Sequence, residues 1–173
     1  MNFQEIYSQF SRIVFNLALQ YVQNRENAEE ITQDTFVAIH RSIDSFKGNA
    51  ELSTWVYRIA INKSLDFIKT QKRKKRFAVI TSIFHPDSEE ILHDYSNFDH
   101  PGVLLEQKEA MTEIFKHINE LPPNQKTALI LSKIEKKSQA EIAEIMKMNT
   151  KGVESLIHRA KVNLAKRLNI SMK

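Results

Sequence analysis

The residues with the clearest potential for chemistry lie near the C-terminal end of the chain, between Ser138 and Leu168. Basic and hydrogen-bonding side chains recur there, off the apolar stripe of the segment: Lys151, Ser155, His158, Arg159 and Lys161. Groups of these types contact the phosphate oxygens and the base edges of duplex DNA. This stretch therefore indicates nucleic-acid recognition.

Two helices joined by a tight turn are expected to position these side chains. Ser138 and Glu141 form a capping box at the start of the first helix, and Asn149 caps the second helix after a turn at Lys147–Asn149. The second helix has a single apolar stripe of Val153, Ile157, Ala160, Leu164 and Leu168. The pattern is typical of a helix-turn-helix, whose second helix enters the major groove. An ordinary helical hairpin with solvated charges has the same periodicity, so periodicity alone leaves both interpretations open.

The composition predicts long helices and a soluble, cytoplasmic protein. The 173 residues include only 3 Gly and 4 Pro, and no Cys that could form a disulfide or a thiolate metal site. No apolar run is long enough to span a membrane, and the first residues lack the layout of a signal peptide.

The charges divide the chain into alternating segments. Residues 1–50 carry a net charge of −2, residues 51–76 of +6, residues 77–110 of −6 and residues 111–173 of +6. Two basic segments separated by an acidic one favour two polyanion-binding lobes with a connector between them. The alternative is a set of solvated helix faces with a soluble linker.

Apolar periodicity predicts an all-α fold of two small helical lobes. A helical bundle is expected at 1–76, with helices at 2–22, 26–43 and 51–76, then an acidic linker at 77–102. A four-helix domain at 103–173, with helices at 103–119 and 124–134, carries the helix-turn-helix. The first lobe ends in the basic run Lys72–Arg76, which exceeds what a helix dipole needs and indicates phosphate contact.

No pattern for catalysis is found in the sequence. A phosphate-cradling glycine loop, a nucleophile elbow and an HExxH helix are all absent. The linker holds His85, His93 and His100 beside three aspartates, but their spacing fits no metal-ligand rule. We therefore expect no enzyme activity, no cofactor and no metal.

Three motifs, in order along nearly the whole chain, resemble those of bacterial RNA polymerase sigma factors. Asn27–Phe36 resembles the acidic motif AEDLVQETF, and Ser53–Asn62 is similar to the signature xxWLYRIAxN. The pattern LP…EIA…HRAR is matched by Leu121–Pro123, Glu141–Ala143 and His158–Lys161. The short length points to the extracytoplasmic-function (ECF) subfamily.

The resemblance implies a role for each face of the first lobe. The residues implied to dock on the β′ coiled coil of core RNA polymerase are Glu30, Gln33, Asp34 and Phe36. Those implied to bind the minus-ten promoter element are Ser45, Lys47, Asn49, Ser53, Arg58, Asn62, Lys63, Lys69, Lys72 and Arg73. For Trp55, core packing is favoured over base stacking. For Arg58, a phosphate contact and an internal ion pair remain equally open.

The second lobe is implied to read the minus-35 element. The residues implied to contact it are Ser138, Thr150, Lys151, Glu154, Ser155, His158, Arg159 and Lys161. Three residues depart from the family pattern: Glu154 and Leu156 stand where basic residues are common, and Lys147 replaces the usual glycine of the turn. The resemblance also implies the polymerase β flap, promoter DNA and an anti-sigma factor as partners, without membrane insertion.

A different class of protein remains as the alternative. A stand-alone helix-turn-helix regulator binds duplex DNA without engaging polymerase. The outward-facing Glu30–Asp34 surface separates the two hypotheses, since acidic groups suit protein docking and oppose DNA binding. A helical adaptor without DNA-binding activity is disfavoured by the two basic lobes.

Overall fold

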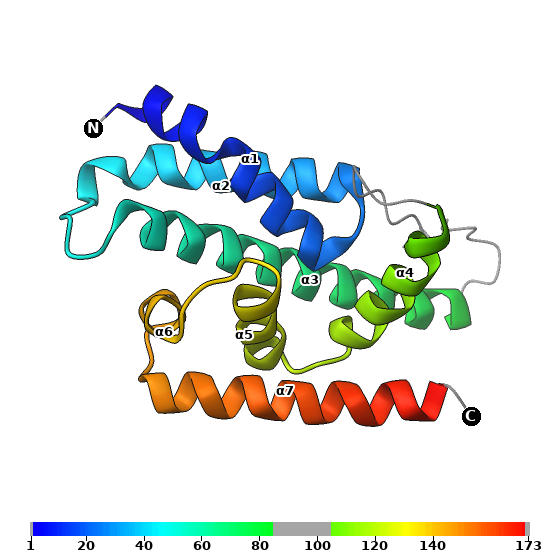
Figure 1. The fold of residues 1–173 in the computed structure, drawn as a ribbon. Helices are drawn as coiled ribbons and strands as arrows, with labels where there is room; N and C mark the ends of the chain where they lie inside the picture. Colours follow the sequence, from blue (N-terminus) through cyan, green and yellow to red (C-terminus); the bar gives the residue numbers. More distant parts are fainter. Residues whose placement is uncertain (1, 85–104, 172–173) are drawn as a thin grey trace.

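The computed structural model describes residues 2–84 and 105–171, and every regular element in these ranges is helical (Figure 1). The helices are α1 (Phe3–Val22), α2 (Arg25–Ser42), α3 (Leu52–Phe84), α4 (Leu105–Asn119), α5 (Pro123–Lys133), α6 (Gln139–Met146) and α7 (Thr150–Ser171), with a short 3-10 turn, η1, at Ile43–Ser45. The predicted all-α fold is confirmed.

The first lobe is formed by α1, α2 and α3, which pack against one another. Asn2 and Glu5 form a capping box at the start of α1, and the side chain of Asn24 accepts a hydrogen bond from the Asn27 backbone at the start of α2 (2.9 Å). Each helix turns one apolar stripe inward, so that side chains such as Ile6 and Ile39 are fully buried.

The second lobe is formed by α4 to α7. In Figure 1, α7 runs along one edge of the molecule, with α5 and α6 between it and α3. Pro123 begins α5, as its missing backbone N–H allows. A small core of Phe115, Ile118, Leu121, Leu129 and Ala160 joins α4 and α5 to α7.

Helix α3 is longer than the sequence analysis predicted. The helix was expected to end at Arg76, but it continues to Phe84, so the first eight residues of the predicted linker are helical. Residues 77–84 contain neither Gly nor Pro, so no helix-breaking residue occurs in this stretch. Phe77, its first residue, is 71% exposed. The linker histidines His85, His93 and His100 lie outside the described residues.

The two lobes pack against each other and share a hydrophobic core. Helix α6 contacts α3, and one cluster of buried side chains runs from α1, α2 and α3 into α5, α6 and α7. Ile130, Leu131 and Ile142 of the second lobe belong to this cluster and are fully buried. The apolar faces of α5 and α6 are thus divided between their own lobe and the first lobe.

Candidate nucleic-acid interface

The helix-turn-helix begins with the capping box that the sequence predicts. The Ser138 hydroxyl accepts a hydrogen bond from the Glu141 backbone N–H (3.2 Å), and the Glu141 carboxylate accepts one from the Ser138 backbone N–H (2.8 Å). That backbone N–H, followed by donors on Lys137 and the Ser138 side chain, lowers the pKa of Glu141 to about 2. Ser138, a predicted DNA contact, therefore has a structural role as the N-cap of α6.

The turn between α6 and α7 accommodates a lysine where glycine is usual. Lys147 adopts left-handed backbone geometry, with φ 53° and ψ 50°, and ends α6. Asn149 then begins α7, because its side-chain oxygen accepts a hydrogen bond from the Gly152 backbone (2.7 Å). The turn keeps its geometry despite the substitution.

Helix α7 separates its apolar and polar residues into two faces. Val153, Ile157 and Ala160 are buried, as predicted. The predicted minus-35 contacts on α7 are all exposed: Thr150, Lys151, Glu154, Ser155, His158, Arg159 and Lys161. Leu156 is only 8% exposed and belongs to the shared core, so its departure from the basic residue of relatives serves packing. The carboxylate of Glu154 remains on the exposed face, where it can accept a hydrogen bond from cytosine.

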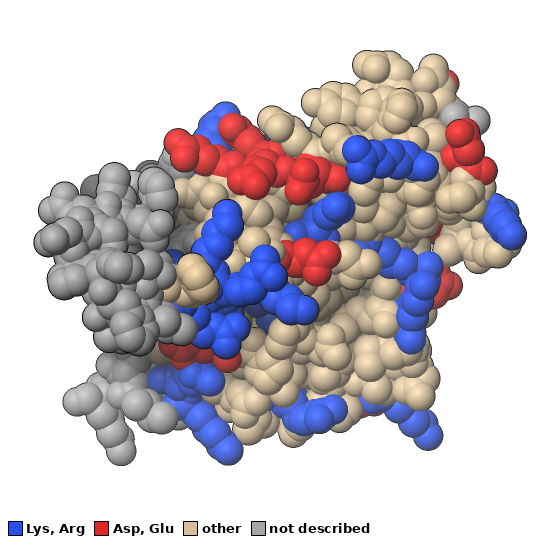
Figure 2. All heavy atoms as spheres, turned by 180° about the vertical axis from the view of Figure 1, so that it is seen from behind, with Lys and Arg blue, Asp and Glu red and all other residues tan. Residues whose placement is uncertain are grey.

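The predicted minus-ten residues lie along α3 and the loop before it. Lys47 and Asn49 are exposed in that loop, on either side of Gly48 with φ 70°, and Ser45 is exposed in η1. Asn62, Lys69, Lys72 and Arg73 are exposed on α3, while Ser53 and Lys63 are half-buried. Figure 2 shows basic side chains gathered on this part of the surface.

Arg58 is engaged inside the molecule. Its guanidinium donates hydrogen bonds to the backbone oxygens of Glu144 (2.6 Å from Nη2) and Ile145 (3.3 Å from Nε). These oxygens belong to the last turn of α6, where a cation is favoured by the helix dipole. In the packed molecule Arg58 is therefore held by backbone carbonyls rather than by a carboxylate.

The aromatic residues of the α3 motif contribute mainly to packing. Trp55 is half-buried and its ring lies 4.9 Å from that of Phe46, centroid to centroid. Tyr57 is buried, and its hydroxyl donates to the Glu135 carboxylate (2.7 Å). Burial is the largest cause of the raised pKa of the Tyr57 hydroxyl, which stays protonated.

The predicted polymerase surface lies on α2, with one correction. Glu30, Gln33 and Asp34 are exposed, and Figure 2 shows acidic side chains in a band beside the basic area. Phe36 is only 4% exposed and packs edge-on against the ring of Tyr7, so it supports this surface from below and cannot contact a partner. Val37, which no sequence motif singled out, is 47% exposed and follows Gln33 by one helical turn, on the same exposed side of α2.

The contacts between the lobes join residues that are far apart in the sequence and match no local sequence pattern. Glu135 accepts hydrogen bonds from Tyr57 and from Gln20 (2.6 Å), which are 78 and 115 residues away in sequence. The hydroxyl groups of Tyr21 and Thr127 also share a hydrogen bond (2.8 Å). Each of these residues alone is compatible with an exposed helix face.

Lys126 is the most unusual of these interlobe residues. Its ammonium group is buried and donates to the backbone oxygen of Tyr21 (2.9 Å) and to the Asn119 side chain (2.6 Å). Burial, followed by the nearby charge of Lys72, lowers the pKa of Lys126 to about 7. Gln23 completes the cluster by accepting a hydrogen bond from Asn119.

Comparison with known proteins identifies the family. The family model "Sigma-70 region 2" matches residues 6–74, and "Sigma-70, region 4" matches residues 112–164. The chain is 31% identical over 169 residues to the ECF RNA polymerase sigma-E factor of Haemophilus influenzae, covering 92% of this chain and 83% of that protein. It is also 31% identical over 170 residues to the ECF RNA polymerase sigma factor SigW of Bacillus subtilis, covering 96% and 88%. The chain belongs to the ECF family of RNA polymerase sigma factors.

A solved structure supports the fold. The sigma factor RpoE of Bartonella quintana, determined in complex with the anti-sigma factor NepR, aligns with a TM-score of 0.65 at 22% identity and covers 97% of each chain. Among the residues described for the present chain, no helix combines the length and apolarity needed to cross a membrane.

Proposed function

We propose that this protein binds core RNA polymerase and directs it to specific promoters, recognising the minus-ten and minus-35 elements without catalysing a reaction itself. It acts in the cytoplasm, where polymerase and promoters meet. The observation that carries the proposal is that one molecule combines the exposed acidic surface of α2 with two basic, DNA-compatible helices, α3 and α7. An acidic surface repels DNA and thus favours a protein partner.

Each surface has one role in this proposal. Glu30, Gln33 and Asp34, with Val37 as an apolar centre, dock on the polymerase β′ coiled coil. The exposed residues of the loop and of α3 hold the minus-ten strand and its phosphates, and the polar face of α7 enters the minus-35 major groove. The second lobe also meets the polymerase β flap.

The packing of the lobes restricts one of the proposed promoter contacts, that of Arg58. Arg58 can contact a promoter phosphate only after its hydrogen bonds to the α6 carbonyls are broken. A phosphate contact by Arg58 therefore requires the lobes to separate, whereas the exposed residues of α3 and of its preceding loop are accessible in the packed molecule. Since RpoE of Bartonella quintana was solved with an anti-sigma factor, an inhibitor of that class is a further proposed partner.

The alternative is a stand-alone helix-turn-helix regulator, which the exposed face of α7 also fits. Such a protein has no use for the acidic surface of α2. A single experiment separates the two: the purified protein is mixed with sigma-free core polymerase, analysed by gel filtration and tested for transcription of fragmented genomic DNA. Co-elution with discrete transcripts supports the sigma factor, whereas DNA binding without co-elution supports the regulator.

A charge reversal tests the docking surface itself. Asp34→Lys is expected to abolish binding to core polymerase while leaving the fold intact, because residue 34 is exposed. Asp66→Lys is the matched control, since Asp66 is an exposed carboxylate on α3, outside the α2 surface. Affinity is measured for both variants against core enzyme without DNA. Unchanged affinity in Asp34→Lys contradicts the docking assignment.

A further inference from the structure

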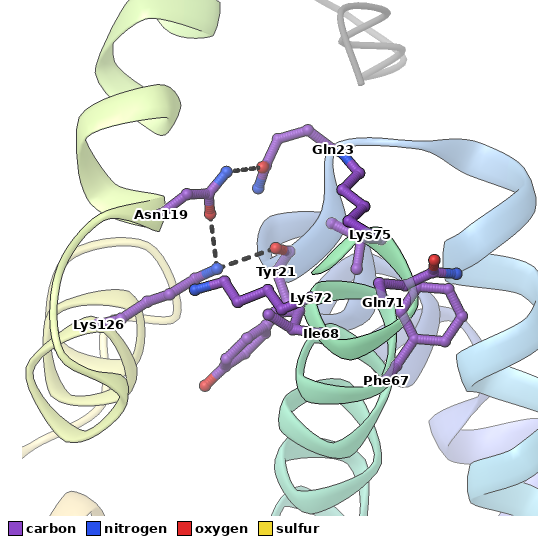
Figure 3. A pocket seen from close by; sticks show the side chains of 10 residues that line it. Tyr21, Gln23, Phe67, Ile68, Gln71, Lys72, Lys75, Asn119 and Lys126 are labelled. Atoms are coloured by element: carbon purple, nitrogen blue, oxygen red, sulfur yellow. Dashed lines mark hydrogen bonds between the residues drawn. The ribbon is translucent and has the colours of Figure 1, made fainter. Parts of the chain in front are cut away.

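A cavity of about 260 Å³ lies between the two lobes, next to the buried contacts of Lys126 (Figure 3). It is lined by the C-terminal end of α1, the second half of α3, and residues of α4 and α5. Part of the wall is apolar, with Phe67 and Ile68 of α3, and its rim carries Lys72, which is exposed to solvent. The cavity is thus accessible from the surface and combines apolar contact with positive charge.

The described residues that line this cavity include three lysines, Lys72, Lys75 and Lys126. Lys72 from the first lobe and Lys126 from the second direct their ammonium groups toward one another in Figure 3, and Lys75 lines the same space. None of the described lining residues is acidic. Two ammonium groups that face each other repel, most strongly where water is excluded. The proximity of Lys72 is one of the two causes that lower the pKa of Lys126.

We propose that this cavity binds a small phosphate monoester, whose phosphate lies between Lys72 and Lys126 and whose apolar group packs against Phe67 and Ile68. A phosphate monoester carries a charge of about −1.5 to −2 at neutral pH, which matches two lysines better than a carboxylate does. Lys72 also belongs to the predicted promoter-binding set, whereas Lys126 is buried and lies outside that set. Because the ligand contacts both lobes, it stabilises the packed arrangement.

Isothermal titration of the full-length chain with phenyl phosphate tests the site. Saturable binding is expected, and it should be tighter than binding of inorganic phosphate, which lacks the apolar group, or of benzoate, which has one charge. Lys72→Met is expected to weaken binding about tenfold, equivalent to about 1.4 kcal/mol. Lys74→Met removes an equal charge from the same exposed run, outside the cavity lining, and should weaken binding by less than about twofold.

Three results overturn the proposal. The first is no saturable binding of phenyl phosphate by the unmodified chain, and the second is equal weakening by Lys72→Met and Lys74→Met, which indicates attraction by the basic run alone. The third is undiminished binding by Lys126→Met that is folded by circular dichroism. If Lys126→Met does not fold, the two exposed variants decide the question. The test uses no polymerase, so its failure leaves the proposed function standing.

Discussion

Helices α3 and α7 are both basic and both carry predicted promoter contacts, but they differ in how far the rest of the molecule covers them. The polar face of α7 is open along its predicted contacts, and the turn and caps that orient it lie within the helix-turn-helix itself. On α3, Arg58 donates hydrogen bonds to backbone oxygens of α6, and Tyr57 donates one to Glu135. The packed molecule therefore presents every predicted DNA contact of α7, whereas on α3 it leaves residues such as Lys69 and Lys72 exposed but holds Arg58 until the lobes part.

The largest expected effect tests whether the lobes share one core. Ile142→Ala in α6 removes a fully buried side chain of the shared cluster and should lower the free energy of unfolding by about 2–5 kcal/mol. Trp55, the single tryptophan of the chain, reports on the first lobe during urea unfolding. The urea midpoint of the Trp55 signal is expected to fall although the mutation lies in the second lobe. Val162→Ala, at an exposed position, should change the free energy of unfolding by less than about 0.5 kcal/mol. An unshifted Trp55 midpoint means that the lobes unfold independently.

The stability of the packing between the lobes is expected to depend on pH. Lys126 has a pKa of about 7 in the packed molecule and an ordinary value of 10.5 when exposed, so between these values the separated form binds more protons. The penalty for burying the charged amine is complete below pH 7, and packing strengthens as pH rises, by at most about 1.4 kcal/mol per pH unit. Among the described residues that line the cavity, the charged groups besides Lys126 are Lys72 and Lys75.

This pH dependence can be measured directly as lobe separation. Because the chain has no cysteine, two can be introduced at exposed positions, Gln9 and Lys166, for fluorescent labels. Energy transfer between the labels is expected to increase from pH 7 to pH 9 as the lobes pack more firmly. Lys126→Met should remove this change, and a similar increase in that variant assigns the effect to another group.

A smaller effect is expected on the open helix. Arg159→Ala should weaken duplex binding severalfold and reduce the slope of log affinity against log salt by about 1, because one phosphate contact is lost. Arg12→Ala removes an exposed charge from α1, outside both predicted DNA sets, and should leave the slope unchanged. Binding isotherms at several salt concentrations provide the measurement. An unaltered slope for Arg159→Ala means that Arg159 contacts no phosphate, which contradicts the placement of α7 in the major groove.

The smallest effect concerns the turn before α7. Left-handed geometry is unfavourable for any side chain, so Lys147→Gly should stabilise the protein by about 0.5–1 kcal/mol in thermal unfolding. Gln9→Gly is the opposite case, because Gln9 is an exposed residue in the interior of α1, and it should destabilise the protein by about 0.5–1 kcal/mol. Destabilisation by Lys147→Gly means that the lysine contributes a contact beyond its backbone geometry.

The sequence predicted the local features of the helices correctly, but it did not predict features that depend on how the lobes pack. The capping residues Ser138, Glu141 and Asn149 and the stripe of α7 were correctly predicted, because caps and periodicity depend on neighbours within one or two turns. The end of α3 was misplaced, because a helix can continue past its amphipathic stretch until a breaking residue. Phe36 was assigned to a docking surface although it is buried, since a motif records which residues recur and not which way they face.

The contacts between the lobes could not be predicted from residues that are neighbours in the sequence. Glu135, Lys126 and Gln20 are polar residues whose partners in the opposite lobe are 78 or more residues away, and only the packed fold brings them together. Their burial also depends on the opposite lobe being packed against them. For the same reason the roles of Arg58 stayed open until the position of α6 was known.

The packing of the lobes has a quantitative consequence for any partner that requires them apart. Such a partner sees only the open fraction of molecules, and its apparent dissociation constant is the intrinsic one divided by that fraction. The equilibrium is intramolecular and thus independent of protein concentration. Weakening an interlobe contact such as that of Tyr57 with Glu135 can therefore raise the apparent affinity for such a partner without altering any residue that the partner contacts. The strength of the interlobe contacts thereby sets the concentration at which such a partner binds.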